Sequence, residues 1–251
     1  MIIDKIKVQN IKDTDAKNIY ILKPYREETT KSEFLEMLEE LDVTNLTDNE
    51  KDLFFSIVKN KYISDEEIMS LSYDQVKKMK ELIIEKDKEG EEYIKASLIS
   101  ASLKANSLMT TSMISEDETF NKSVFNMIKD MSDGKEAVKL IGLLTGSTNV
   151  SDVVAWDEYI DDKNFDFQRI YDKDLTKFIE NKIKYFEGQL EQELSTSERK
   201  IYEKVVSTFK TLKDYHETQK EEYTSSVNQV IKRNTPNILE LLDVNKQKKS
   251  N

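Results

Sequence analysis

The stretch from residue 174 to 230 reads DLTKFIENKIKYFEGQLEQELSTSERKIYEKVVSTFKTLKDYHETQKEEYTSSVNQV. Apolar residues recur every three or four positions in both halves of it, which is the spacing of a buried helical face. The first half has Leu175, Phe178, Ile179, Ile183, Phe186 and Leu190, and the second has Ile201, Val205, Phe209, Leu212, Tyr223, Val227 and Val230. The short link between the halves predicts a long antiparallel helical hairpin.

Helix starts along the chain are marked by capping boxes, in which a Ser or Thr is followed three residues later by Glu or Gln. The hydroxyl accepts a hydrogen bond from an unpaired N–H at the helix start, and the acid or amide reaches back to the capping residue. The pairs are Thr30 with Glu33, Thr47 with Glu50, Ser64 with Glu67, Ser72 with Gln75, Ser115 with Glu118 and Ser195 with Glu198. Because the 251 residues include only 5 Gly and 2 Pro, these starts predict an all-α fold.

Changes in the pattern define four segments. Residues 1–30 alternate short apolar and charged runs and predict an extended or flexible N-terminal arm. Residues 31–163 predict a multi-helix body, which includes a helix around residues 153–160. Residues 164–233 form the hairpin, and 234–251 are expected to be a short helix, begun at Pro236, with a Lys-rich tail. Polar residues on the facing stripe of the second hairpin helix, namely His216, Gln219 and Ser226, predict that its end projects beyond its partner.

The least charged segment, residues 93–115, predicts a helix that is apolar over a wide arc. We expect this central helix to run through the middle of the fold. The alternative interpretation is a helix that inserts into a membrane or into the groove of a partner.

Composition excludes several functional classes. Without Cys, the chain cannot form a disulfide scaffold, a thiolate nucleophile or a Cys-based metal site. His216 is the only histidine, so the helical di-iron and zinc protease motifs are absent, and we expect this residue at the surface or at an interface. A formal net charge of -11 disfavours nucleic acid as a partner. The sequence shows neither a secretory signal peptide nor a run of ~18 apolar residues.

The sequence also contains no motif that predicts a metal, cofactor or small-molecule site. Two loops resemble calcium-binding EF-hand loops, but Lys61 and Phe167 stand where such loops need glycine. We therefore expect no metal, no cofactor and no small-molecule ligand, and we interpret the paired acids as solvated. The cluster Lys246, Lys248 and Lys249 can contact an anionic partner, although a solvated terminus is the commoner explanation.

These features favour a non-enzymatic, bacterial protein-interaction or structural protein that binds a protein partner or self-associates, for example through a coiled coil. The expected partner-binding residues are Tyr215, His216, Gln219, Tyr223 and Val227. A second hypothesis is an exported, secretion-linked or virulence-associated protein, and a third is an enzyme that uses only Asp, Glu, Lys and Tyr. The expected location is the cytoplasm, or outside the cell by a route without a cleaved signal peptide.

Overall fold

The computed structural model of the chain describes residues 28–40, 46–80, 84–86, 92–94, 100–145 and 169–248; for 40, 84–86, 92–94, 100 and 231–248 it describes the backbone. The expected arm up to residue 27 and the expected helix around 153–160 lie outside the described residues. The elements are α1 (Lys31–Glu40), α2 (Asp48–Val58), β1 (Tyr62–Ile63), α3 (Asp65–Met69), α4 (Tyr73–Lys80), β2 (Ile84–Lys86), β3 (Glu92–Ile94), β4 (Ser100–Ala101), α5 (Leu103–Thr110), η1 (Thr111–Met113), α6 (Glu118–Asp130), α7 (Gly134–Thr145), α9 (Leu175–Leu190) and α10 (Thr196–Lys248).

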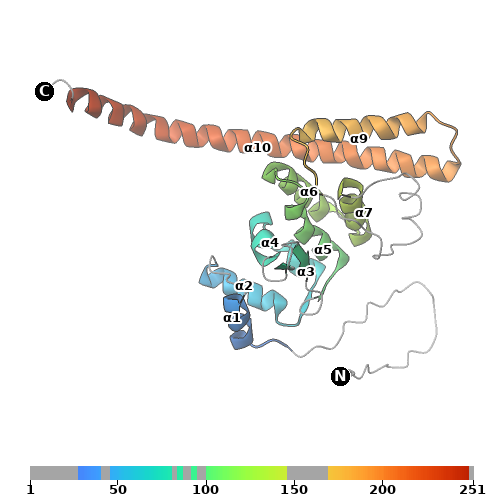
Figure 1. Ribbon diagram of the computed structural model, residues 1–251, viewed down its shortest axis with the longest axis horizontal. Helices are drawn as coiled ribbons and strands as arrows, with labels where there is room; N and C mark the ends of the chain where they lie inside the picture. The colour runs from blue at the N-terminus through green and yellow to red at the C-terminus, as the bar shows by residue number, and fades with distance from the viewer. Residues whose placement is uncertain are drawn as a thin grey trace.

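The predicted all-α class is confirmed, since the strands among the described residues are two or three residues long. β1 pairs in parallel with β4, and β2 pairs antiparallel with β3. In Figure 1, α1 and α2 form one end of the body, α3 to α7 lie in the middle, and α9 and α10 lie along its far edge. One hydrophobic core runs through these layers, from Phe34 in α1 to Leu212 in α10.

Most of the capping boxes form as predicted. The side chains of Thr47 and Glu50 cap α2, and those of Ser64 and Glu67 cap α3. Reciprocal hydrogen bonds of the same kind join the following pairs: Thr30 with Glu33, Ser72 with Gln75 and Ser195 with Glu198. Each pair is separated by only three residues, so the sequence carries all the information that the motif needs.

The box predicted at Ser115 and Glu118 is wrong. Asp117 caps α6 instead, because its carboxylate accepts hydrogen bonds from the N–H groups of Thr119 at 2.8 Å and Phe120 at 3.0 Å. Ser115 turns inward and donates to the Asn121 side chain at 2.9 Å. Glu118 is thereby left to accept a hydrogen bond from the Tyr73 hydroxyl at 2.7 Å, which ties α6 to α4.

The prediction of one helix over 93–115 is also wrong in its first half. β3 and β4 occupy part of that segment, and α5 begins only at Leu103. Ser102 sets this start, because its hydroxyl accepts from the N–H of Ala105 at 3.0 Å while its own N–H donates to the carbonyl of Ile63 at 2.9 Å. Serine often competes with the helical backbone in this way. The helix that does form is central and largely buried, as at Ala105 and Leu108.

No new helix begins at Pro236, because α10 runs without a break from Thr196 to Lys248. Proline removes one backbone hydrogen bond from a helix and crowds the carbonyl four residues earlier, but its fixed φ of about −65° is itself helical, and here the helix continues through it. The expected boundary after residue 233 is therefore absent from the backbone of α10.

Glu50 shows how a capping box also joins helices. Besides closing the box with Thr47, its carboxylate accepts a hydrogen bond from the Lys78 ammonium in α4 at 2.6 Å. This bond to Lys78, followed by the bonds to Thr47, lowers the pKa of Glu50 to about 2. The ionised carboxylate thus helps to hold α2 against α4.

We expect Glu50→Gln to destabilise the protein at neutral pH and the difference from the native protein to shrink in acid. The folded pKa is below the ordinary value of 4.5, so the stabilisation is present above pH 4.5 and is lost as the pH falls toward about 2. Urea unfolding across this range measures the difference. Glu39→Gln, at an exposed position of α1, is the control for removing a surface charge. A difference that stays constant with pH would contradict this account.

Candidate functional site

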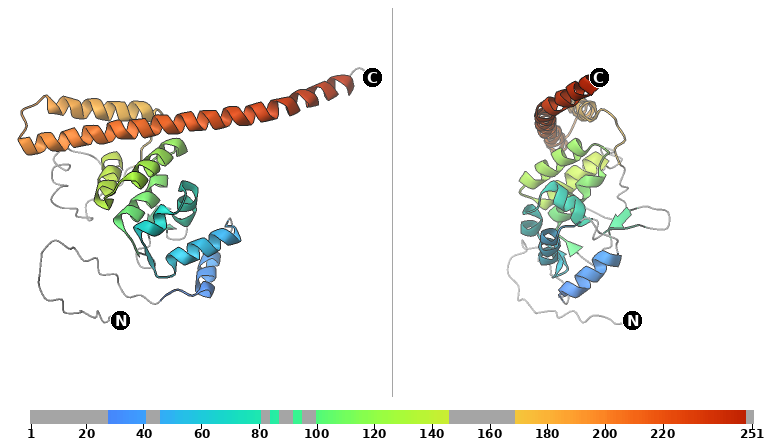
Figure 2. Two further views of the ribbon diagram at one scale, coloured as in Figure 1. Left: turned by 180° about the vertical axis from the view of Figure 1, so that it is seen from behind. Right: turned by 90° about the vertical axis from the view of Figure 1, so that its left-hand side faces the viewer.

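α10 is much longer than the helices that hold it. Its 53 residues span about 80 Å, whereas its neighbour α9 has 16. The two run antiparallel, since Lys210 pairs with Glu187 and Lys213 with Glu180, both at 2.8 Å. Near the start of α9, Thr176 accepts a hydrogen bond from the ammonium of Lys220 at 3.2 Å. Beyond that point α10 continues alone among the described residues (Figures 1 and 2). We call residues 221–248 the projecting end.

Five residues of α10 spaced seven apart, at positions 202, 209, 216, 223 and 230, form one line along the helix. The first three of them point into the body. Tyr202, Phe209 and His216 on this line are 4%, 0% and 2% exposed. The next two members of the line, Tyr223 and Val230, are 64% and 55% exposed. In a helix with 3.6 residues per turn, consecutive members of such a line are about 20° apart around the axis, so the line that is buried in the body continues into solvent with a gradual turn.

Aromatic rings from two helices cover the buried part of this line. Phe186 of α9 stacks on Phe209 with ring centroids 5.8 Å apart and contacts Tyr202 at 6.2 Å. Phe120 of α6 meets His216 edge to face at 5.5 Å. Such pairs hold α10 in one position on the body.

His216 lies inside the protein, between α6 and α10. Its Nδ1 is 3.4 Å from the hydroxyl oxygen of Ser123. Burial lowers the pKa of His216 below 6.5, and Lys220 lowers it further, while Asp117, Glu217 and Asp174 oppose the shift. The neutral ring is therefore the form that fits the folded protein.

We expect the native protein to lose stability as the pH falls below 6.5 and His216→Gln to lose less. A folded pKa below the unfolded value means that the unfolded state binds the proton more readily, so acid favours unfolding. The loss of stability in this pH range can be assigned to His216 because it is the one histidine of the chain. The measurement compares the thermal unfolding midpoints of the two proteins below pH 6.5 and above about pH 5, where most carboxylates remain ionised. Equal losses in the two proteins would show that His216 does not titrate as described.

Two more of the expected partner-binding residues, Tyr215 and Gln219, are also partly or largely covered by the body. Tyr215 is half-buried, and its hydroxyl donates to the carboxylate of Asp130 in α6 at 2.6 Å. This bond, together with burial, raises the pKa of Tyr215 to about 12. Gln219 is 7% exposed, and its amide donates to Glu222 at 2.7 Å. Of the five expected residues, the structure leaves Tyr223 and Val227 exposed.

Val230 belongs with these two residues; the sequence pattern placed it on the apolar face of the helix, but it was not among the expected partner-binding residues. We call Tyr223, Val227 and Val230 the exposed stripe. They follow one another at four and three positions and are 64%, 38% and 55% exposed. The signal that could have found Val230 is its distance of seven residues from Tyr223.

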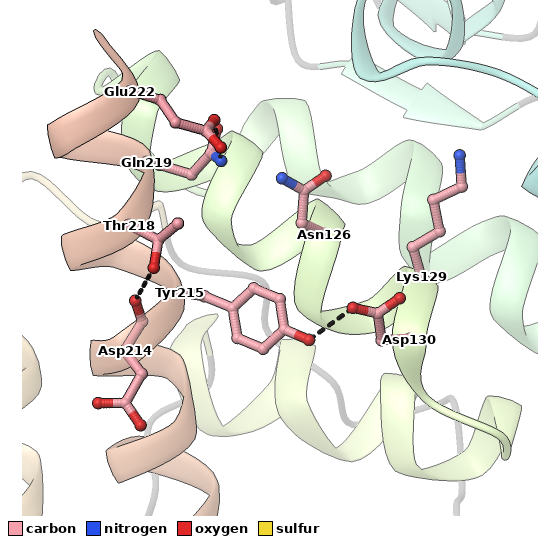
Figure 3. Close-up of a pocket in the computed structure, with 8 residues that line it drawn as sticks. All are labelled: Asn126, Lys129, Asp130, Asp214, Tyr215, Thr218, Gln219 and Glu222. Atoms are coloured by element: carbon pink, nitrogen blue, oxygen red, sulfur yellow. Dashed lines mark hydrogen bonds between the residues drawn. The ribbon is translucent and has the colours of Figure 1, made fainter. Parts of the chain in front are cut away.

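A groove of about 360 Å³ lies between α6 and α10, where the projecting end begins (Figure 3). We call it the root groove. Its lining residues from α6 are Asn126, Lys129 and Asp130, and those from α10 are Asp214, Tyr215, Thr218, Gln219 and Glu222. The sequence alone could not predict this groove, because residues on its two sides are far apart in the chain; Asp130 and Tyr215, for example, are 85 residues apart.

The root groove is acidic. It has three carboxylates, from Asp130, Asp214 and Glu222. The ammonium of Lys129 donates to the carbonyl of Leu71 at 2.9 Å and lies 5.7 Å above the Phe125 ring. The Tyr215 hydroxyl, with its pKa of about 12, keeps its proton. The three carboxylates suit contact with a cationic group.

Two further observations apply to the described part of the chain. No three of its His, Asp and Glu side chains are grouped so that they could hold a metal ion. None of the helices within it combines the length and apolar character that crossing a membrane requires.

Comparisons of the chain with models of known families, with curated proteins and with solved structures gave no match.

Proposed function

We propose that this protein is a non-enzymatic helical interaction protein and that its partner-binding surface is the projecting end of α10. The observation that carries the proposal is the line of every seventh residue in α10. It passes from positions that are at most 4% exposed to positions that are more than half exposed, and in a straight helix each step of seven residues turns the line by only about 20°. The spacing of the side chains that pack α10 against the body thus continues into a part of the helix that no described residue covers.

The physical argument concerns the exposed stripe. Burying apolar surface contributes about 25 cal/mol per Å², so a row of three large apolar side chains gains when another surface covers it. All of residues 221–230 are exposed, and the other side chains among them are polar. A narrow apolar row between polar flanks is the pattern that a partner helix binds in a coiled coil.

The rest of the chain gives the projecting end a fixed direction. The rings of Phe186, Phe209, Phe120 and His216 hold the covered half of α10 against α9 and α6. A long helix anchored in this way presents its free half as an ordered surface, which lowers the entropy lost when a partner binds.

A capture experiment tests the proposal. We expect the immobilised full chain to retain a protein, either another copy of itself or a different protein from the source cells. The combined variant Tyr223→Ser, Val227→Ser and Val230→Ser is expected to lose it. The matched control is Ser225→Ala, Asn228→Ala and Gln229→Ala, which changes exposed positions on other faces of the same turns. Equal retention by both variants, or none by the native chain, would refute the proposal.

The exported alternative concerns location and is separate from this surface. A protein that leaves the cell without a cleaved signal could use the same projecting end outside it. Deleting residues 2–25 and measuring secretion tests export. If both forms stay in the cell, the exported alternative is removed and the interaction proposal is unaffected.

A further inference from the structure

We infer that the partner of the projecting end is a second copy of this chain, bound antiparallel along the exposed stripe. The inference rests on the proposed function and names the partner. Three features of the chain support it: the direction of α9, the distribution of charge along α10, and the position of the root groove.

The first feature is the helix that α10 already binds. α9 runs antiparallel to α10, and its first turn ends beside Lys220, whose ammonium donates to Thr176 at 3.2 Å. The projecting end of a second copy, also antiparallel, can continue where α9 stops. It would then cover Tyr223, Val227 and Val230 as α9 covers Phe209. The packing would be that of a two-stranded coiled coil.

The second feature is the charge along the helix. Residues 214–222 include four acids (Asp214, Glu217, Glu221 and Glu222) and one base (Lys220), for a net charge of -3. Residues 223–248 include four bases (Lys232, Arg233, Lys246 and Lys248) and two acids (Glu240 and Asp243), for a net charge of +2. With full overlap of residues 221–248, an antiparallel pair puts Lys246 and Lys248 of each copy beside Glu221 and Glu222 of the other, whereas a parallel pair puts these acids beside each other. Lys232 and Arg233 lie near the midpoint of the overlap and favour neither direction.

The third feature is the root groove. A projecting end of 28 residues is about 42 Å long, so the tip of an antiparallel copy with full overlap reaches the root. There it meets the groove that holds Asp130, Asp214 and Glu222. The sequence positions Lys246 and Lys248 lie in that tip. The acidic groove is thus where the cationic end of the second copy arrives.

The shape of the protein also favours this direction. In Figures 1 and 2 the body lies at one end of α10, and the far part of the projecting end extends clear of it on one side. An antiparallel pair places the two bodies at opposite ends of the shared helices. A parallel pair brings both bodies to the same end, where they compete for space.

Single cysteines in this Cys-free chain test the inference. With full overlap of residues 221–248, the midpoint falls between residues 234 and 235. Asn234→Cys therefore lies next to its counterpart, on the line seven residues beyond Val227. Asn245→Cys would lie about 30 Å from its counterpart, far beyond the ~7 Å between Cα atoms that a disulfide can span. Lys232→Cys is the control for the opposite face at the same level of the helix.

We expect mild oxidation of the full chain to give a covalent dimer with Asn234→Cys. The dimer yield with Asn245→Cys or Lys232→Cys should be at least about tenfold lower, given the distance limit for disulfides. Equal cross-linking through Asn234→Cys and Asn245→Cys would indicate a parallel pair and overturn the inference. The absence of a dimer from all three variants, with the mass of one chain by light scattering, would overturn it too. If the native chain then still retains a different protein through the exposed stripe, the proposed function stands without the second copy.

Discussion

Replacing Phe209 by alanine is expected to lower the free energy of unfolding by about 3–5 kcal/mol, the range for large aromatic residues in cores. Phe209 is 0% exposed and stacks on Phe186 with ring centroids 5.8 Å apart, so its removal leaves a cavity between α9 and α10. Urea or guanidinium unfolding of the full chain measures the change. A loss below about 1 kcal/mol would mean that α9 and α10 do not pack as described.

The matched control is Tyr223→Ala, two heptads further along the same face. Tyr223 is 64% exposed, so its replacement is expected to change the free energy of unfolding of the monomer by no more than about 0.5 kcal/mol. The same change should weaken association, because the tyrosine is part of the exposed stripe. The pair of variants thus separates the part of α10 that stabilises the fold from the part that binds. A large loss of monomer stability in Tyr223→Ala would show that another segment covers this residue.

Replacing Val227 by aspartate is expected to weaken association by at least about a hundredfold. The substitution removes an apolar contact and puts a charge without a partner into a seam that excludes water, at a cost of about 3 kcal/mol or more. Sedimentation equilibrium of the native protein and the variant gives the two dissociation constants. Circular dichroism shows whether the helix is retained.

Ser225→Asp is the control for Val227→Asp. It adds the same charge to the same turn of α10, but two residues away and so on the opposite face. Both positions are exposed, so neither substitution disturbs the core. We expect Ser225→Asp to associate like the native protein. If both variants lose association equally, net charge and not the exposed stripe governs it.

Local features of this fold could be predicted from the sequence. The capping pairs at Thr47 with Glu50 and Ser195 with Glu198 formed as expected, because each needs only the residues of one helical turn. The capping prediction failed where a stronger cap lay within the same turn, since Asp117 took the place of Ser115. Local rules identify the candidates, and the choice between neighbouring candidates depends on the structure around them.

Features that need distant parts of the chain could not be predicted. The strand β4 forms against β1, and the N–H of Ser102 donates to the carbonyl of Ile63, so the start of α5 depends on a strand some forty residues earlier. His216 is buried because Phe120 and Ser123 cover it, and Ser123 is 93 residues away in the chain. From the sequence alone, the polar His216 among the apolar residues of the helix indicated that the exposed end of the helix had already begun there.

The candidate site was predicted in part. The spacing of apolar residues identified α10 and placed Tyr223 and Val227 on its free half, where the structure finds them exposed. Tyr215, His216 and Gln219 share that face, but α6 crosses it at their level. The sequence shows which residues share a face, whereas the packing of α6 decides how far along the face the body extends.

Light scattering of the full chain over a range of micromolar concentrations tests the central claim most directly, namely that the projecting end of α10 binds protein. We predict a mass that rises from one chain toward two as the concentration increases. The triple serine variant of the exposed stripe should keep the mass of one chain throughout. A native chain that stays strictly monomeric, and that also retains no other protein in the capture experiment, would contradict the claim.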